Sequence, residues 1–218
     1  MFDKLRLEDA LARYKRELAG AHWDAEKYKW EAVKWFQDNW DVDAPDFADM
    51  LNHALDRTEN LLMSAQYYPK GMLDVFAKAA PEEVRAMFIA LFDESRDVFE
   101  RIDAFKSQSA IMHEKYGNGA RQHYQYENAI STYLWLRYPD KYYIYKLGEV
   151  KIVASELKSN YRFKKGAYAD NIRNFLKLYD EISAALLLDG ELIKLFKSRL
   201  TDTCYADPRL KTLTIDVI

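Results

Sequence analysis

Cysteine, glycine and proline are scarce in this chain of 218 residues. Cys204 is the only cysteine, which excludes an internal disulfide and a metal site built from several cysteines. Seven glycines and five prolines are few for a turn-rich β-fold, and they favour helices. No apolar run approaches the roughly 20 residues of a membrane-spanning helix, and the charged start Met1–Arg6 has no signal-peptide pattern. We therefore expect a cytoplasmic protein without a membrane partner.

The common signatures of catalysis are also missing. Gly117 and Gly119 stand alone, so the sequence has no glycine-rich loop that would cradle a phosphate. The four histidines form neither an H-x-x-x-H pair nor an H-E-x-x-H motif, and no serine or cysteine has a nucleophile context. The chain by itself is expected to be no enzyme and to hold no metal or cofactor.

What the sequence has is apolar mass at helical spacing. Hydrophobic residues make up 49% of the chain and aromatic residues 15%, enough for a sizeable core. Leu7, Leu11, Tyr14 and Leu18 predict a first helix over 3–19, and similar stripes recur along the chain. The pattern predicts an all-α, irregular fold of roughly ten helices, among them an aromatic helix over 23–40.

Breaks in the pattern predict the organisation of the domains. Gly117-Asn118-Gly119 is the clearest break, and it predicts two packed sub-domains, 1–117 and 120–218. Tyr142–Tyr145 is compatible with a short strand but has no partner strand. The apolar pattern near the end is still running at Ile218, so we expect a further domain beyond it.

Charge is distributed unevenly around a net value of −3. Residues 41–103 carry 14 Asp/Glu against 6 Lys/Arg, whereas residues 137–165 carry 8 Lys/Arg against 3 Asp/Glu. A polyanion would be steered to the second segment. Lysines there can neutralise phosphates and tyrosines can stack on exposed bases. The candidate DNA-binding residues are Lys141, Lys146, Lys151, Lys158, Arg162, Lys164, Lys165, Tyr142, Tyr143 and Tyr161.

One string imitates the PD…(D/E)-x-K pattern of metal-dependent nucleases. Asp140 follows a proline, and Glu149 stands two residues before Lys151. That chemistry needs the ends of two adjacent strands, so that the carboxylates and the lysine converge on a metal. Because Glu149 opens a segment with helical spacing, a helix stop followed by an exposed helix is the favoured interpretation.

Four strings resemble a known family. They are YLWLRYPDKYYIYK at 133–146, WFQDNWD at 35–41 with Asp46-Phe47, YYPKGML at 67–73, and the close with Asp207-Pro208 and LTIDVI at 213–218. Together they resemble the helical N-terminal region ahead of the AAA+ motor in McrB-like proteins, the GTPase subunits of methylcytosine-dependent (type IV) restriction endonucleases. The resemblance implies that a motor beyond residue 218 would use GTP and magnesium and that a McrC-type subunit would cut.

In such a system, which serves antiphage defence, the N-terminal region would recognise DNA, including modified bases such as 5-methylcytosine. N-terminal regions differ widely in this family, so the base that is read does not transfer. The alternative function is a protein-interaction or assembly module of the same AAA+ complex, in which the acidic segment 41–103 docks a partner and DNA is not contacted.

Overall fold

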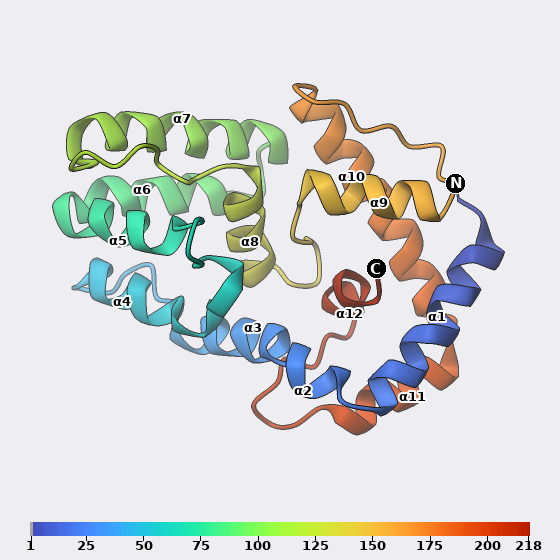
Figure 1. The fold of residues 1–218 in the computed structure, drawn as a ribbon. Coiled ribbons are helices and arrows are strands. Elements are labelled where there is room, and N and C mark those ends of the chain that lie inside the picture. Colours follow the sequence, from blue (N-terminus) through green and yellow to red (C-terminus); the bar gives the residue numbers. More distant parts are fainter. Residues whose placement is uncertain (1) are drawn as a thin grey trace. The chain divides into compact units, whose positions relative to one another are not determined.

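The computed structural model describes residues 2–218, and most of these residues are helical (Figure 1). They form twelve α-helices and one 3₁₀ segment. Residues 2–218 contain no β-strand, only an isolated bridge between Ser64 and Tyr67. The predicted all-α fold is therefore confirmed. None of these helices is long and apolar enough to cross a membrane.

The chain forms two compact units. The terminal unit comprises residues 2–30 and 138–218, and the central unit comprises residues 31–137. The structure thus divides the chain at different places from the predicted break at Gly117–Gly119, which lies inside the central unit. The glycines end a helix at Tyr116, but the next helix packs back onto the same core. A unit is defined by its shared core, so a loop rich in glycine can lie inside one.

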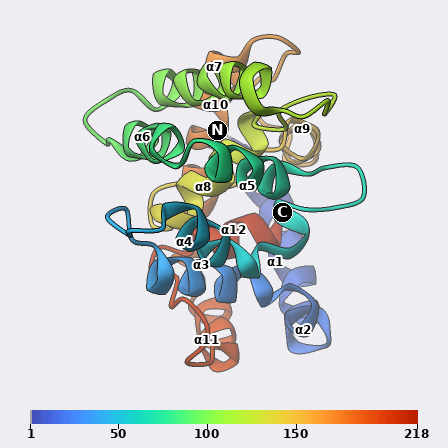
Figure 2. The same cartoon turned by 90° about the vertical axis from the view of Figure 1, so that its left-hand side faces the viewer.

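The central unit is built from helices that follow one another in the chain. Neighbours α4 and α5, α5 and α6, and α6 and α7 pack against each other, as Figure 2 shows from the side. Its elements are most of α3 (Tyr28–Asn39), α4 (Phe47–Ala54), the 3₁₀ segment (Asp56–Leu61), α5 (Pro69–Ala79), α6 (Pro81–Phe92), α7 (Val98–Tyr116) and α8 (Glu127–Arg137).

An aromatic cluster forms the core of the central unit. Phe88 lies 5.3 Å from Phe105, 5.4 Å from Tyr133 and 5.3 Å from Trp40, measured between ring centroids. In α8, all residues from 129 to 136 are buried. A helix buried all round is a core helix, so α8 completes the unit.

The terminal unit joins the two ends of the chain. Helix α12 contacts both α1 and α10, and α1 also contacts α11. One aromatic cluster gathers Trp23, Trp30 and Phe196, and a second gathers tyrosines around Phe175. The elements are α1 (Lys4–Ala19), α2 (His22–Glu26), α9 (Leu147–Glu156), α10 (Tyr168–Leu186), α11 (Gly190–Arg199) and α12 (Lys211–Val217).

The two units carry opposite charge. The terminal unit has 21 Lys/Arg against 17 Asp/Glu, and the central unit has 11 Lys/Arg against 18 Asp/Glu. Their nets of +4 and −7 add to the −3 of the whole chain. A polyanionic ligand would therefore be attracted to the terminal unit and repelled by the central one.

Candidate functional site

A basic hollow of the terminal unit lies where α9 ends. The Ser159 amide donates to the Ala154 carbonyl at 2.7 Å, and the Lys158 amide donates to the Ser155 carbonyl at 3.0 Å. Lys158 has a φ of +46°, the left-handed conformation that follows a helix in a Schellman-type end. This end turns the chain sharply and brings residues 158–163 back beside the last turns of α9.

Side-chain hydrogen bonds fix the shape of that returning segment. The Arg162 guanidinium donates to the Ser159 carbonyl at 2.8 Å, and Asn174 of α10 donates to the Arg162 carbonyl at 3.0 Å. The Tyr161 hydroxyl donates to Glu181 at 2.7 Å. The segment is thus attached to α10 at two points, which gives the hollow a defined wall.

The hollow is a surface pocket of about 460 Å³, named here the basic pocket. It joins one face of α9 to the returning segment. Hydroxyl and amide groups stand beside the cations, and two aromatic rings that are neither fully buried nor fully exposed complete the lining. The lining residues are Lys151, Ala154, Ser155, Lys158, Ser159, Asn160, Tyr161, Arg162 and Phe163.

Positive charge dominates this pocket. Lys151, Lys158 and Arg162 form no ion pair with any residue from 2 to 218, and no carboxylate of those residues lines the pocket. Lys151 lies on α9 and Lys158 lies in the turn beyond its end, and both line the pocket. Three cations beside hydroxyl and amide donors can hold a phosphate or another oxyanion by charge-assisted hydrogen bonds.

The structure brings four of the ten predicted DNA-binding residues into this pocket: Lys151, Lys158, Tyr161 and Arg162. Lys164 and Lys165 follow directly and are exposed. Lys146 stands apart, because it pairs with Glu149 at 2.8 Å. Lys141 is exposed and lies over the ring of its neighbour Tyr142.

Two of the predicted stacking rings lie in the core instead. Tyr142 is 4% exposed and Tyr143 is 1% exposed. The Tyr143 hydroxyl donates to Asp180 at 2.9 Å and accepts from Lys211 at 2.7 Å. Burial and the neighbouring Asp180 raise the pKa of Tyr143. These rings cannot stack on a base without leaving the core, so they are removed from the candidate site.

The residues of the nuclease-like string have other partners. Asp140 accepts a hydrogen bond from Tyr205, and Glu149 lies in the first turn of α9 with its ion pair to Lys146. Lys151 lines the basic pocket. Within the part of the chain that the structure describes, no group of three or more Asp, Glu, His or Cys side chains is placed to hold a metal.

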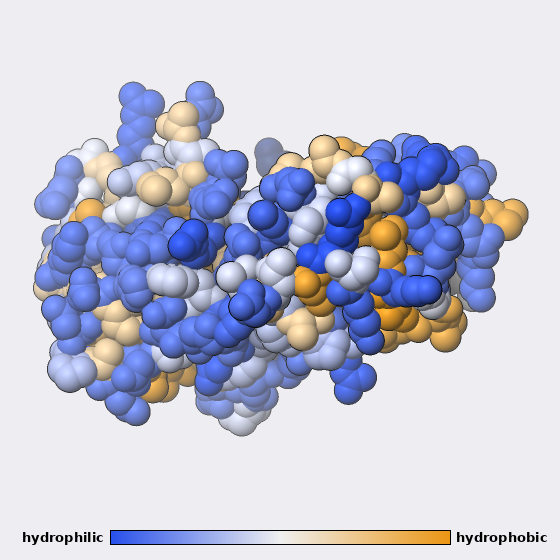
Figure 3. All heavy atoms as spheres, turned by 90° about the horizontal axis from the view of Figure 1, so that it is seen from below, coloured by the Kyte–Doolittle hydropathy of each residue, from blue (hydrophilic) through white to orange (hydrophobic). Residues whose placement is uncertain are grey.

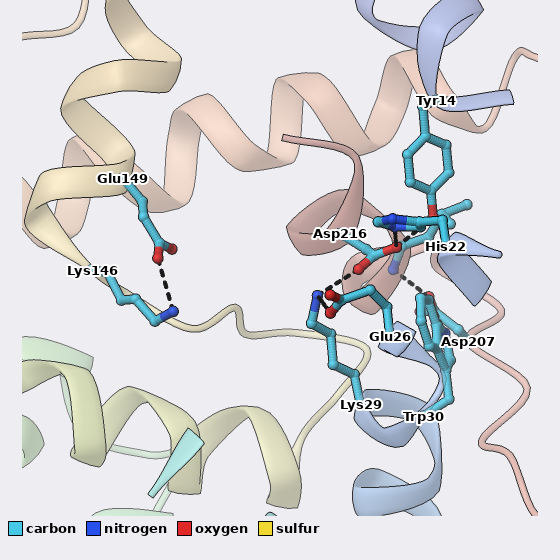
Figure 4. A network of polar contacts seen from close by, with 10 residues as sticks. Tyr14, His22, Glu26, Lys29, Trp30, Lys146, Glu149, Asp207 and Asp216 are labelled. Atoms are coloured by element: carbon cyan, nitrogen blue, oxygen red, sulfur yellow. Dashed lines mark hydrogen bonds and ion pairs between the residues drawn. The ribbon is translucent and has the colours of Figure 1, made fainter. Parts of the chain in front are cut away.

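A separate polar cluster anchors α12 within the terminal unit (Figure 4). The buried Asp216 accepts from the Tyr14 hydroxyl at 2.6 Å and from Lys29 at 2.5 Å, and it lies 2.9 Å from a ring nitrogen of His22. Burial and the Asp216 carboxylate raise the pKa of Tyr14, so this hydroxyl remains a donor. The network links α12 to α1, α2 and α3.

The second buried carboxylate of that cluster caps α12. Asp207 accepts from the Trp30 indole at 3.3 Å and from the amides of Leu213 and Thr212 at 2.8 and 3.3 Å. Burial raises the pKa of Asp207 to about 6, although these three N–H donors oppose the shift. The donors saturate the carboxylate, so we interpret it as structural.

Sequence reasoning missed the uncharged lining of the basic pocket. Ser155, Ser159 and Asn160 carry no motif, and only the turn at Lys158 places them beside the cations.

No family model, no curated protein and no solved structure matches this chain. The site therefore has to be interpreted from its own geometry.

Proposed function

We propose that the terminal unit binds the phosphate backbone of DNA at the basic pocket. One observation carries the proposal: Lys151, Lys158 and Arg162 converge on one hollow without an acidic partner among residues 2–218. Cations held free of internal ion pairs are available to replace the counterions of a polyanion. The positive net charge of the terminal unit adds long-range attraction.

The rings of the pocket supply a second kind of contact. Tyr161 and Phe163 are partly exposed and lie within the same lining as the cations. Cations beside accessible aromatic rings suit a nucleic acid better than a small inorganic anion, since bases stack on such rings. A modified cytosine turned out of the duplex would meet Tyr161 or Phe163 first.

The resemblance to McrB-like proteins gives this binding a biological setting. On that proposal the chain is the recognition region of a restriction system, and a GTP-dependent motor and a McrC-type nuclease supply the chemistry. Phosphate contacts position a protein on DNA, and base contacts specify the sequence. The cations of the basic pocket should therefore set affinity, whereas Tyr161 and Phe163 should set any preference for a modified base.

The test is a salt titration of binding to a labelled duplex. Each phosphate contact contributes about −0.9 to the slope of log affinity against log salt. Lys151→Gln should reduce that slope by about 0.9, and Lys151→Gln with Arg162→Gln should reduce it by about 1.8. Fluorescence anisotropy with unmodified and 5-methylcytosine duplexes measures both the slope and the discrimination.

The matched control neutralises two lysines of the same unit outside the pocket. Lys194 and Lys197 are exposed on α11 and form no ion pair with any described residue. Lys194→Gln with Lys197→Gln changes the net charge equally and should leave the slope unchanged. Equal effects of the pocket pair and the control pair would show that only net charge matters, and the basic pocket would lose its role.

An apolar groove favours the second candidate function, a protein-interaction module. The groove has a volume of about 760 Å³ and lies between α1 and the α10–α11 junction, with Leu11, Ala184 and Leu188 in its lining. Leu188 is 87% exposed. Figure 3 shows hydrophobic side chains gathered on the part of the surface that holds α1 and α11.

The lining of this groove indicates the partner that would fit. Asp189 already pairs with Lys15 at 3.2 Å and Glu181 accepts from the Tyr161 hydroxyl at 2.7 Å, so the apolar lining would provide most of the affinity for its occupant, the apolar face of an amphipathic helix. Leu188→Asp should weaken binding of such a helix and leave DNA affinity unchanged. Loss of complex assembly with intact DNA binding would assign the two functions to two surfaces.

A further inference from the structure

The first helix carries a row of arginines that the basic pocket does not include. Helix α1 buries Leu7, Leu11, Tyr14 and Leu18. Arg6, Arg13 and Arg16 stand at helical spacing on another face and are exposed. Arg13 and Arg16 form no ion pair with any residue that the structure describes.

These arginines line a hollow of about 610 Å³ between α1 and the end of α9, named here the arginine groove. The Arg6 guanidinium donates to the Glu156 carbonyl at 3.1 Å, and the Asp3 amide donates to the Leu157 carbonyl at 2.9 Å. Three guanidinium groups face the carboxylates of Asp9 and Glu156 in the lining, so the groove keeps one excess positive charge.

The basic pocket and the arginine groove border different sides of the end of α9. Ser155 and Lys158 line the pocket, and the two residues between them, Glu156 and Leu157, line the groove. Figure 1 shows the start of α1 beside the end of α9 within the same unit. A ligand held in the pocket would have to pass around this end of α9 to reach the groove, which an extended polyanion can do and a small anion cannot.

We infer that a nucleic-acid backbone held in the basic pocket continues along the arginine groove, where Arg13 and Arg16 bind further phosphates of the same molecule. The inference rests on the proposed function and extends its footprint to a helix 135 residues away in the sequence, counted from Arg16 to Lys151. A single phosphate fills one hollow, whereas only an extended polyanion reaches both. The planar guanidinium group also matches the geometry of phosphate oxygens.

The experiment neutralises the two arginines in the whole chain. Arg13→Gln with Arg16→Gln should reduce the salt slope for a 20-base-pair duplex by about 1.8. Between 50 and 200 mM salt the affinity of the parent should then fall about twelvefold more than that of the variant. Arg13→Lys with Arg16→Lys retains both charges and should retain the slope. A labelled dinucleotide, too short to span both hollows, should bind the Gln pair as it binds the parent.

The outcomes separate the inference from the proposed function. If Lys151→Gln lowers the slope and the arginine pair behaves like the control Lys194→Gln with Lys197→Gln, the arginine groove has no part in binding. If the parent binds neither the duplex nor a single strand at 50 mM salt, both the function and the extended footprint are overturned. Both arginines are exposed, so their replacement should not disturb the core. Circular dichroism of each variant checks that it is folded.

Discussion

Lys158 combines an unfavourable backbone conformation with a charge at the candidate site. Its φ of +46° follows the end of α9, a position where glycine is the usual residue. A residue with a β-carbon loses roughly 1–2 kcal/mol in the left-handed region. Strained residues often mark functional positions, and the basic pocket offers a reason to keep a lysine here.

Replacing Lys158 should therefore improve stability and impair binding together. Lys158→Gly relieves the strain, and after the entropy cost of glycine it should raise the free energy of unfolding by up to about 1 kcal/mol. It should also lower the salt slope for DNA by about 0.9. Lys158→Ala should lower the slope equally without the gain in urea-unfolding experiments. A stabilised Lys158→Gly protein with unchanged DNA binding would remove this residue from the site.

Asp207 should give the protein an unusual dependence of stability on pH. Its pKa is about 6 in the folded protein, against about 3.9 in an unfolded chain. Between these values the folded state binds more protons, so the free energy of unfolding falls as the pH rises. The shift of about two pKa units corresponds to roughly 3 kcal/mol, lost between about pH 4 and pH 6.

The variant Asp207→Asn isolates this effect, because asparagine does not titrate and all other groups cancel in the comparison. Urea unfolding at pH 4.5, 5.5 and 7 should show the parent losing stability relative to the variant as the pH rises. A difference that is independent of pH would contradict the raised pKa.

At the scale of elements, periodicity predicted most helices but not their interruptions. The helix predicted over 23–40 is two helices, α2 and α3, that separate at Lys27. The aromatic stripe continues through the break, so spacing alone does not reveal it. Pro69 is the first residue of α5, where its missing N–H costs nothing, so a proline in the sequence does not by itself mark a turn.

The segment Tyr142–Tyr145 shows why burial is harder to predict than helix position. All four side chains are at most 4% exposed, although the segment is neither helix nor strand. Alternation of side chains cannot identify such a segment, because its burial comes from α10 and α12, which follow much later in the chain. For the same reason the sequence shows which segment is rich in cations but not which of its rings are accessible.

At the scale of the molecule, the division into units decides which charges act together. The predicted sub-domain 120–218 contains the basic segment but lacks α1. In the structure α1 belongs to the terminal unit, and its arginines line a groove that borders the same end of α9 as the basic pocket. Contacts between residues so far apart in the sequence depend on the tertiary fold, so spacing rules that reach about one helix in length do not find them.

The division itself can be tested with fragments. Residues 31–137 contain all the helices that surround Phe88, including α8 with Tyr133. This fragment should therefore fold alone, with a helical circular dichroism spectrum and a cooperative thermal transition. The fragment 1–117, which ends at the break predicted from the sequence, lacks α8 and leaves Phe88 and Phe105 without Tyr133. It should be aggregated or should unfold without cooperativity.

The fragment 31–137 also provides a functional control for the charge distribution. With 11 Lys/Arg against 18 Asp/Glu, the fragment 31–137 should not bind DNA even at 50 mM salt. Binding by this fragment would move the DNA surface out of the terminal unit. A cooperative 1–117 together with an unfolded 31–137 would restore the boundary at Gly117–Gly119, because a core that survives the loss of α8 cannot depend on Tyr133.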